Sequence, residues 1–344
     1  MISFSLNKDS RTPYYTQLVD QFEAAVKNEG LKKGEILPSM NGLADKLELS
    51  KETVKKAYAI LRDRGLIESR QGKGFYVREK SEGKYLRVLV ISDVHSIYKQ
   101  ILLGAFQQKL SERGNCETTV LLHNQDIKLL RYYLDRNLDS YDWYVVFPHF
   151  PLDDKTQKEV LRQLSRIPNR KLILMDRWMD ELPGNYGAVY QRFGTDACEA
   201  LEQYAPELKK KGRLNVMALN SSMYKGEIEE GLRLFAKKHG IASVFGEGIP
   251  EDILPDDVCI VLSSQHDTGL VALANKIRDK GLKTGKDVFI ISYNDIPLNE
   301  LVLGGLTTLS TDFALMGENA AEMILSGSPR KVHNPFRLIR RKTF

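Results

Sequence analysis

The sequence has few cysteines and no long hydrophobic run, and both shortages exclude whole classes of protein. The three cysteines, Cys116, Cys198 and Cys259, lie at least 61 residues apart, so they predict neither a disulfide framework nor a zinc knuckle. No apolar run approaches the roughly 20 residues that cross a bilayer, and the N-terminus lacks the basic start and apolar stretch of a signal peptide. We therefore expect a cytoplasmic protein in a reducing compartment, with no membrane partner.

Motifs for metal binding and catalysis are lacking as well. The six histidines are at least 26 residues apart, so no ligand pair stands at metal-binding spacing. No Gly-x-Ser-x-Gly motif or Walker loop is present, and the glycine-rich residues 72–74 precede a strand-like segment rather than a helix. We assign no catalytic residue, no metal ligand and no cofactor.

Length and charge indicate two unlike domains. Single hydrophobic cores stop growing at roughly 250–300 residues, and this chain has 344, of which 42% are hydrophobic and 28% charged. Residues 1–80 contain 15 Lys and Arg against 11 Asp and Glu, a net charge of +4, which leaves +1 for the other 264 residues. Because the basic excess lies at the front, the pattern favours a polyanion partner for the first domain.

The first domain has the pattern of three helices followed by a hairpin. Apolar residues recur at three- and four-residue steps over residues 13–28, and Ser39 and Ser50 are good N-caps for two further helices. Two short strands are expected at 66–69 and 75–77, with glycines in the turn between them. Three helices and a hairpin make a winged helix, whose third helix enters the major groove of double-stranded operator DNA. The candidate DNA-binding residues are Ser39, Ser50, Lys51, Thr53, Lys55, Lys56, Gln71, Gly72, Lys73 and Gly74.

Residues 10–78 resemble the DNA-binding domain of the GntR family of bacterial regulators. The resemblance rests on PYYTQL, GEILPS, LADKLELSKETVKKAY and LRDRGLIESRQGKGFYV, which occur in the family's order. It implies that Ser39, Lys51, Thr53 and Lys55 contact DNA and that residues 71–74 form the wing tip over the minor groove. Met40 and Asn41 replace a common charged pair, and lysines 51 and 55 stand where arginine is frequent, which affects the operator sequence rather than DNA binding itself.

The rest of the chain has the pattern of an α/β protein with parallel sheets. A polar linker is expected at 79–85, between a DNA-binding domain of residues 1–78 and a second domain of residues 86–344. Continuous apolar strands alternate with helical segments, which indicates buried parallel strands, and a break at 191–195 favours two similar lobes. Ligands of such folds bind outside the carboxyl ends of the strands, where this chain has polar side chains such as those of 92–93, 148–149 and 176–177.

The second domain resembles the effector-binding domain of the LacI family, which is related to periplasmic sugar-binding proteins. The resemblance rests on KLILMDRWMDELPGNYGAVYQRFGTDA, on residues 266–325 and on the closing FRLIRRKTF. It implies a two-lobed domain that binds a ligand between its lobes. The candidate ligand-binding residues are Asp93, His95, Ser96, Tyr98, Asp176, Arg177, His266, Asp267, Asn294 and Asp295. The family's usual arginine before the next helix is absent, with Lys225 nearest, and the domain combination resembles the arabinose repressors of Gram-positive bacteria.

These observations predict a ligand-responsive transcription regulator that consists of a winged helix and a two-lobed periplasmic-binding-protein-like domain. We expect a homodimer that represses a sugar-utilisation operon in response to a monosaccharide such as a pentose or deoxyhexose. Alternatives are an effector that is a sugar phosphate or a non-sugar metabolite, or an enzymatic C-terminal domain, which would need a longer chain. Asp176 and Arg177 could instead form a structural ion pair, and Asn294 and Asp295 could simply initiate a turn.

Overall fold

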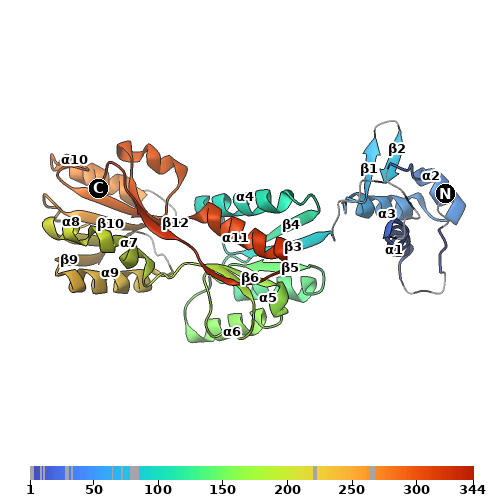
Figure 1. Ribbon diagram of the computed structural model, residues 1–344, viewed down its shortest axis with the longest axis horizontal. Helices are drawn as coiled ribbons and strands as arrows, with labels where there is room; N and C mark the ends of the chain where they lie inside the picture. The colour runs from blue at the N-terminus through green and yellow to red at the C-terminus, as the bar shows by residue number, and fades with distance from the viewer. Residues whose placement is uncertain are drawn as a thin grey trace. The chain divides into compact units, whose positions relative to one another are not determined.

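The structure is a computed structural model of the 344-residue chain. It describes residues 4–7, 10, 12–27, 31, 34–63, 65–70, 73–77, 85–219, 223–263 and 268–344. The chain divides into two compact units, residues 1–85 with 113–115, and residues 86–112 with 116–344 (Figure 1). The expected linker at 79–85 falls almost wholly outside the described residues, so its extent remains a prediction.

The N-terminal unit is a winged helix, as the sequence predicted. Its elements are α1 (Tyr14–Lys27), α2 (Met40–Leu47), α3 (Lys51–Asp63), β1 (Ile67–Arg70) and β2 (Gly74–Val77). Both predicted caps form: Ser39 Oγ accepts the amide of Gly42 at 3.0 Å, and Ser50 Oγ accepts that of Thr53 at 3.1 Å. The strands pair antiparallel with Ile67 opposite Val77, one residue displaced from the expected strand starts.

One hydrophobic core holds the winged helix together. The predicted inner face of α3, with Val54 and Ala57 fully buried, packs against Leu18 and Phe22 of α1. The hairpin is attached through Ile67 and Val77, which belong to the same core. The outer face of α3 is thereby fixed relative to the hairpin.

The C-terminal unit contains two six-stranded sheets, which define an N-lobe and a C-lobe. The N-lobe contains β3 (Leu86–Ser92), α4 (Ile97–Ser111), β4 (Cys116–Leu122), α5 (Ile127–Asn137), β5 (Trp143–Val146), α6 (Asp154–Leu164), β6 (Leu172–Asp176), β7 (Gly187–Tyr190), α11 (Phe313–Ser326) and β13 (Lys331–His333). The C-lobe contains α7 (Asp196–Leu201), α8 (Ala205–Lys210), β8 (Leu214–Leu219), α9 (Lys225–His239), β9 (Ser243–Glu247), β10 (Val258–Ser263), α10 (Thr268–Asp279), β11 (Phe289–Tyr293), β12 (Thr307–Thr311) and β14 (Phe336–Ile339). Short 3-10 helices lie at Asn169–Lys171, Glu202–Tyr204, Pro297–Glu300 and Val302–Gly304.

The two sheets share one strand order. The N-lobe order β4-β3-β5-β6-β7 corresponds to β9-β8-β10-β11-β12 in the C-lobe, and all of these neighbours are parallel. Strand β13 extends the first sheet in parallel, whereas β14 extends the second antiparallel. The continuous apolar runs of β5 and β6 are buried at every position, because helices cover both faces of the sheet. The predicted α/β fold with two parallel lobes is confirmed.

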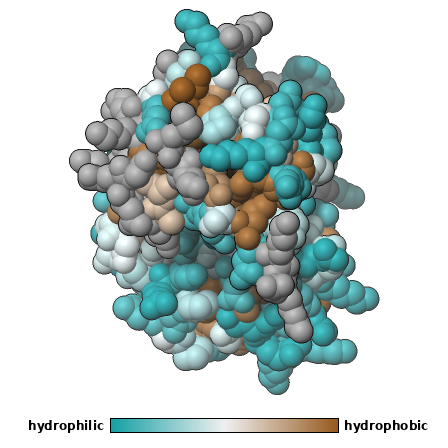
Figure 2. All heavy atoms as spheres, turned by 90° about the vertical axis from the view of Figure 1, so that its right-hand side faces the viewer, coloured by the Kyte–Doolittle hydropathy of each residue, from teal (hydrophilic) through white to brown (hydrophobic). Residues whose placement is uncertain are grey.

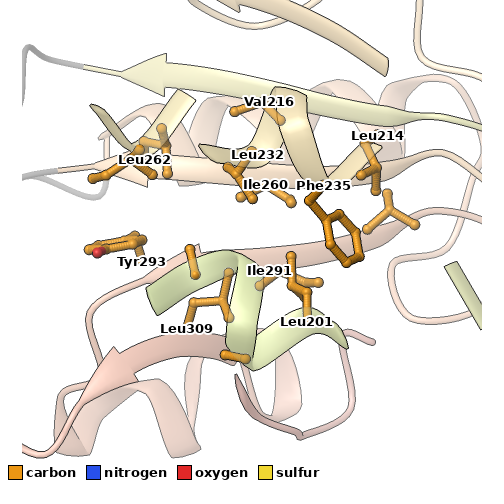
Figure 3. Close-up of a cluster of buried hydrophobic side chains, with 14 of the residues drawn as sticks. Leu201, Leu214, Val216, Leu232, Phe235, Ile260, Leu262, Ile291, Tyr293 and Leu309 are labelled. Carbon is orange, nitrogen blue, oxygen red and sulfur yellow. The ribbon is translucent and has the colours of Figure 1, made fainter. Parts of the chain in front are cut away.

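Each lobe has a hydrophobic core on both faces of its sheet. In the N-lobe, α4 and α11 cover one face and α5 and α6 the other (Figure 1). Figure 3 shows the larger C-lobe core, in which side chains from β8, β10, β11 and β12 meet those of α7 and α9. No helix in the described part of the chain is long and apolar enough to cross a membrane.

The chain passes between the lobes three times, at 191–195, 311–312 and 334–335. Asn334 connects all three passages and is fully buried. Its amide nitrogen donates to the Tyr190 carbonyl at 2.8 Å, and its side-chain Nδ2 donates to Thr311 Oγ1 and to the Asp312 carbonyl, both at 2.8 Å. The first passage coincides with the predicted break at 191–195.

Candidate functional site

The outer face of α3 carries the predicted recognition residues. Ser50, Lys51 and Lys55 are exposed, and the half-buried Thr53 joins its Oγ1 to Ser50 Oγ at 2.8 Å. Lys55 lies 3.3 Å from Glu52, but both side chains are largely exposed, so water screens the pair and leaves the lysine able to exchange partners. The start of α3 therefore presents hydroxyl and ammonium groups to solvent.

Lys56 differs from its neighbours on α3. Its ammonium lies 3.9 Å from the centre of the Tyr15 ring on α1, in a cation–π contact. The side chain is exposed but leans across the α1–α3 junction. Lys55 pairs within α3, whereas the ammonium of Lys56 contacts another helix of the unit.

The wing is attached to the loop before α2. Tyr58 on α3 donates its hydroxyl to the Pro38 carbonyl at 2.8 Å and packs edge-on against Phe75 with ring centres 5.1 Å apart. Burial raises the pKa of Tyr58, so its hydroxyl remains a donor. Ser39 is exposed in this loop, as are the predicted wing residues Lys73 and Gly74. The other two predicted wing residues, Gln71 and Gly72, lie outside the described residues.

A buried polar cluster lies where the two lobes meet, and we call it the inter-lobe cluster. Its members come from strand ends of the N-lobe, from α4 and from the loop before α9 of the C-lobe: Asp93, Lys99, His149, Asp176, Gln191 and Tyr224. Asp93 forms an ion pair with Lys99, whose side chain is 2% exposed. Burial acts to raise the pKa of Asp93, but His149 and Lys99 outweigh it, so the pKa lies below its usual value.

His149 contacts both lobes directly. Its Nδ1 lies 2.7 Å from the hydroxyl of Tyr224, and its Nε2 lies 3.2 Å from Asp176 Oδ2. The second approach has ion-pair distance without hydrogen-bond geometry, so the buried Nε2 has no hydrogen-bond partner. Gln191 Nε2 donates to Asp176 Oδ1 at 2.6 Å. The imidazole nitrogen is therefore a free hydrogen-bonding group beside a carboxylate.

Aromatic rings surround the C-lobe side of the cluster. Tyr224 stacks on Phe193 with ring centres 3.9 Å apart and planes 8° from parallel. The guanidinium of Arg177 lies 5.5 Å from the Tyr224 ring and donates a hydrogen bond to Gln157 at 3.0 Å. Arg177 is half-buried and does not pair with Asp176, whose carboxylate instead lies 3.2 Å from His149. The alternative of a structural Asp176–Arg177 ion pair is therefore not what the structure contains.

The two lobes place polar residues at equivalent strand ends in the same unusual conformation. Asp176 ends β6 with φ 70°, and Asn294 follows β11, the corresponding strand of the C-lobe, with φ 69°. Positive φ is uncommon outside glycine and costs backbone energy, which makes such positions typical of binding sites. Asn294 Oδ1 is buried without a hydrogen-bond partner, as is Ser92 Oγ at the end of β3. Both lobes thus carry unsatisfied polar atoms at carboxyl strand ends.

The remaining predicted ligand residues have different surroundings. Ser96 caps α4 and is buried, Tyr98 packs against Phe313 with ring centres 4.6 Å apart, and His95 is exposed. Burial raises the pKa of Tyr98 well above its usual value. His266 and Asp267 lie outside the described residues.

Asp295 is held by an ion pair rather than placed in the cluster. Arg341 donates to both of its carboxylate oxygens at 2.8 and 2.9 Å, and Thr308 Oγ1 donates to it at 2.8 Å. Burial favours a higher pKa, but these donors lower the pKa of Asp295 overall. Its carboxylate is therefore already occupied.

Sequence reasoning missed Lys99, His149, Gln191 and Tyr224 as site residues. His149 stands directly after an apolar strand, so the strand-end rule contained the signal for it. No local pattern marks Lys99, a lysine inside a helix, as buried. Among the described residues, no group of three or more His, Cys, Asp and Glu side chains is arranged to hold a metal ion.

Two family models match separate parts of the chain. The model of bacterial regulatory proteins of the gntR family matches residues 14–77, and the model of the periplasmic binding protein-like domain matches residues 207–344. The chain joins a GntR-family DNA-binding domain to a periplasmic-binding-protein-like domain. The protein is therefore a DNA-binding transcription regulator with an effector-type second domain.

Similar proteins of known sequence are transcription regulators. The regulator YhcF of Bacillus subtilis (strain 168) is 25% identical over 105 residues, which are 30% of this chain and 81% of YhcF. The mannosyl-D-glycerate transport/metabolism system repressor MngR of Escherichia coli (strain K12) is 24% identical over 177 residues, or 48% of this chain and 58% of MngR. The match thus spans little more than half of the length of MngR.

Solved structures share the fold over most of the chain. A crystal structure of the Lac repressor bound to ONPG in the repressed state has a TM-score of 0.60 and 16% sequence identity. The similarity covers 94% of this chain and 95% of that one. At this identity the likeness establishes the architecture and leaves the effector open.

Proposed function

We propose that the protein is a ligand-responsive repressor of a sugar-utilisation operon, with a monosaccharide such as a pentose or deoxyhexose as effector. It acts as a homodimer on a partly palindromic operator, because paired recognition helices reach half-sites about one helical turn, roughly 34 Å, apart. The relationship to MngR, itself a repressor of a mannosyl-D-glycerate system, supports repression and a carbohydrate effector.

The observation that supports a sugar most strongly is the inter-lobe cluster. Hydroxyl groups of a sugar donate and accept hydrogen bonds, so they suit a site with both kinds of partner. Asp176 accepts, Arg177 donates, and His149 Nε2 is buried without a hydrogen-bond partner. Since an unsatisfied buried polar atom costs about 1–3 kcal/mol, a ligand that satisfies it gains affinity. Closure of the lobes on that ligand would be the switch that alters DNA binding.

Screening with L-arabinose, fucose, other monosaccharides and sugar phosphates by thermal shift tests this proposal. A ligand at 100 times its Kd adds about 2.7 kcal/mol of stability if it binds only the folded state. Stabilisation by a sugar phosphate alone would replace the monosaccharide with a phosphorylated effector. Failure of every sugar and sugar phosphate to stabilise the protein would contradict the proposal.

Asp176→Ala and Arg177→Ala are expected to lose the effector response while binding operator normally. Loss of a charged hydrogen bond costs about 1.5–3 kcal/mol, or ten- to a hundredfold in affinity. Operator affinity without effector should stay within a few-fold, because a ligand acts only through its different affinities for the two lobe arrangements. Operator titrations with and without the effector measure both quantities.

Asp180→Ala is the matched control, since Asp180 is an exposed carboxylate four residues after Asp176. It should keep the full response. Retention of the response in both cluster variants would place the effector elsewhere. Loss of operator binding in both would mean that these residues serve folding.

Lys51→Ala and Lys55→Ala are expected to weaken DNA binding. Each lysine that contacts a phosphate contributes about one ion to the salt dependence of binding, so each variant should lower the slope by about one per subunit. The operator is first selected from random-sequence duplexes with the full chain and then titrated at several salt concentrations.

Lys46→Ala on α2 supplies the comparison, because Lys46 is also exposed but lies outside the predicted recognition surface. Its affinity and slope should match those of the unmodified protein. If Lys51→Ala and Lys55→Ala behave like Lys46→Ala, α3 is not the recognition helix.

A further inference from the structure

A groove of about 860 Å³ lies between α5 and α6 of the N-lobe. None of its nine lining residues belongs to the inter-lobe cluster. The two helices lie on one face of the sheet, where Leu130 and Leu134 of α5 share a core with Val160 and Leu164 of α6. Their inner faces are therefore fixed by packing, and the groove lies on the outer surface of this layer.

Basic residues dominate the lining of this α5–α6 groove. Five of the nine residues are cations, and only Asp154 and Glu159 are acidic. The cations are Lys128, Arg131, Lys155, Lys158 and Arg162. On each helix they are three or four residues apart, which places them on one face. Two basic rows thus border the same groove.

Local partners already occupy Glu159 and the two N-cap carboxylates beside the groove. Glu159 accepts two hydrogen bonds from Arg162, each of 2.7 Å, and one from Gln163; these bonds lower its pKa to about 2. The N-cap carboxylates Asp126 and Asp153 are occupied by backbone amides at 2.7 and 3.0 Å. These carboxylates therefore have their own partners at the helix starts.

Three lysines of the groove remain without such partners. Within the described part of the chain, no residue forms an ion pair or side-chain hydrogen bond with Lys128, Lys155 or Lys158. Arg131 has only a 3.8 Å approach to the exposed Asp135. Like charges gathered in a concave surface repel one another and focus a positive potential there. A bound anion would remove this repulsion.

We propose that the α5–α6 groove docks an acidic segment of a partner protein. The groove is open to solvent, and its lining runs over residues 127–131 of α5 and 154–162 of α6, which suits an extended segment rather than an enclosed small molecule. Its lining includes Ile127 and the aliphatic stems of the lysines and arginines, so an apolar side chain between the acidic ones would find apolar contacts. A DNA duplex offers phosphates but no apolar side chain for these contacts.

The test uses the full chain and a short fluorescent peptide rich in glutamate with interspersed leucines, measured by anisotropy at several salt concentrations. Lys155→Glu/Lys158→Glu is expected to weaken binding about tenfold or more, because it places like charges face to face with the peptide. Lys128→Glu on the opposite side of the groove should weaken it in the same direction. Circular dichroism confirms that the variants are folded.

Two controls carry the same change of charge elsewhere. Lys209→Glu/Lys210→Glu reverses exposed lysines on α8, and Lys51→Glu/Lys55→Glu reverses those of the recognition helix. Both should bind the peptide as the unmodified protein does. The proposal is wrong if the unmodified protein does not bind the peptide, or if the controls lose as much affinity as the groove variants. It is also wrong if the groove variants lose affinity only for random-sequence duplex DNA, since the occupant would then be nucleic acid.

Discussion

Lys99→Met is expected to destabilise the C-terminal unit by about 3–5 kcal/mol, because removal of one partner from a buried ion pair leaves the other charge uncompensated. The side chains of Lys99 and Asp93 are only 2% and 6% exposed, so water cannot replace the lost ammonium. Methionine keeps the length and apolar stem of lysine. Urea unfolding of the full chain at neutral pH measures the loss.

The way in which the stability loss of Lys99→Met changes with pH tests whether the uncompensated charge of Asp93 causes it. In the unmodified protein the pKa of Asp93 is lowered, so its contribution to stability is present above its unfolded pKa and is lost as the pH falls. Without Lys99, burial opposes ionisation, so the deficit should be largest at neutral pH and shrink in acid. The double variant Asp93→Asn/Lys99→Met should recover most of the stability.

Lys225→Met provides a contrast, since Lys225 pairs with Glu247 at 2.7 Å but the carboxylate is 87% exposed. Lys225→Met should lower the free energy of unfolding far less than Lys99→Met does. Equal losses in the two lysine variants would show that burial of the Asp93 pair is not what matters.

Gly317→Ala is expected to destabilise the N-lobe by about 3 kcal/mol, the upper end for overpacked cores. A Cβ at this position of α11 would lie 2.2 Å from the Leu102 carbonyl oxygen and 2.9 Å from the Phe106 amide nitrogen of α4. Both are backbone atoms, so no side-chain rotation relieves the clash. The helices would have to separate, and Figure 1 shows them side by side over one face of the sheet.

Gly104→Ala, in contrast, should stabilise the N-lobe. Gly104 lies within α4, is exposed, and has nothing within 4 Å of an added Cβ. Alanine in an exposed helix interior is favoured over glycine by up to about 1 kcal/mol. Chemical unfolding of the two variants side by side separates close helix packing from helix propensity. A neutral Gly317→Ala would mean that α4 and α11 can move apart at little cost.

The sequence predicted elements well where the signal is local. Ser39 and Ser50 cap the two helices that they were expected to cap. Helix α4 begins at Ile97, directly after its cap Ser96, and its Lys99 is buried. A lysine near a helix start predicts a solvated surface, and only the neighbouring Asp93 makes its burial possible.

The sequence predicted two of the six residues of the inter-lobe cluster. Asp93 and Asp176 follow apolar strands, so the strand-end rule finds them. The contact between His149 and Tyr224 joins residues 75 apart in the chain and in different lobes, which no periodicity encodes. Likewise, Arg341 neutralises Asp295 across 46 residues, so a carboxylate that resembles a ligand residue in sequence is occupied in the fold. Among the residues coloured in Figure 2, hydrophilic side chains predominate on the face drawn, with a few hydrophobic ones between them.

Because the chain passes between the lobes three times, neither lobe can be completed before most of the other has been translated. The N-lobe contributes β3 and α4 early, but its core also needs Phe313, Met316 and Met323 of α11. While the C-lobe is being translated, the apolar side of α4 has no covering helix and is exposed to aggregation or chaperone binding. The lobe that leaves the ribosome first is thus finished after nearly the whole of the other has been made, and a nonsense mutation after Thr311 would leave it without its last helix.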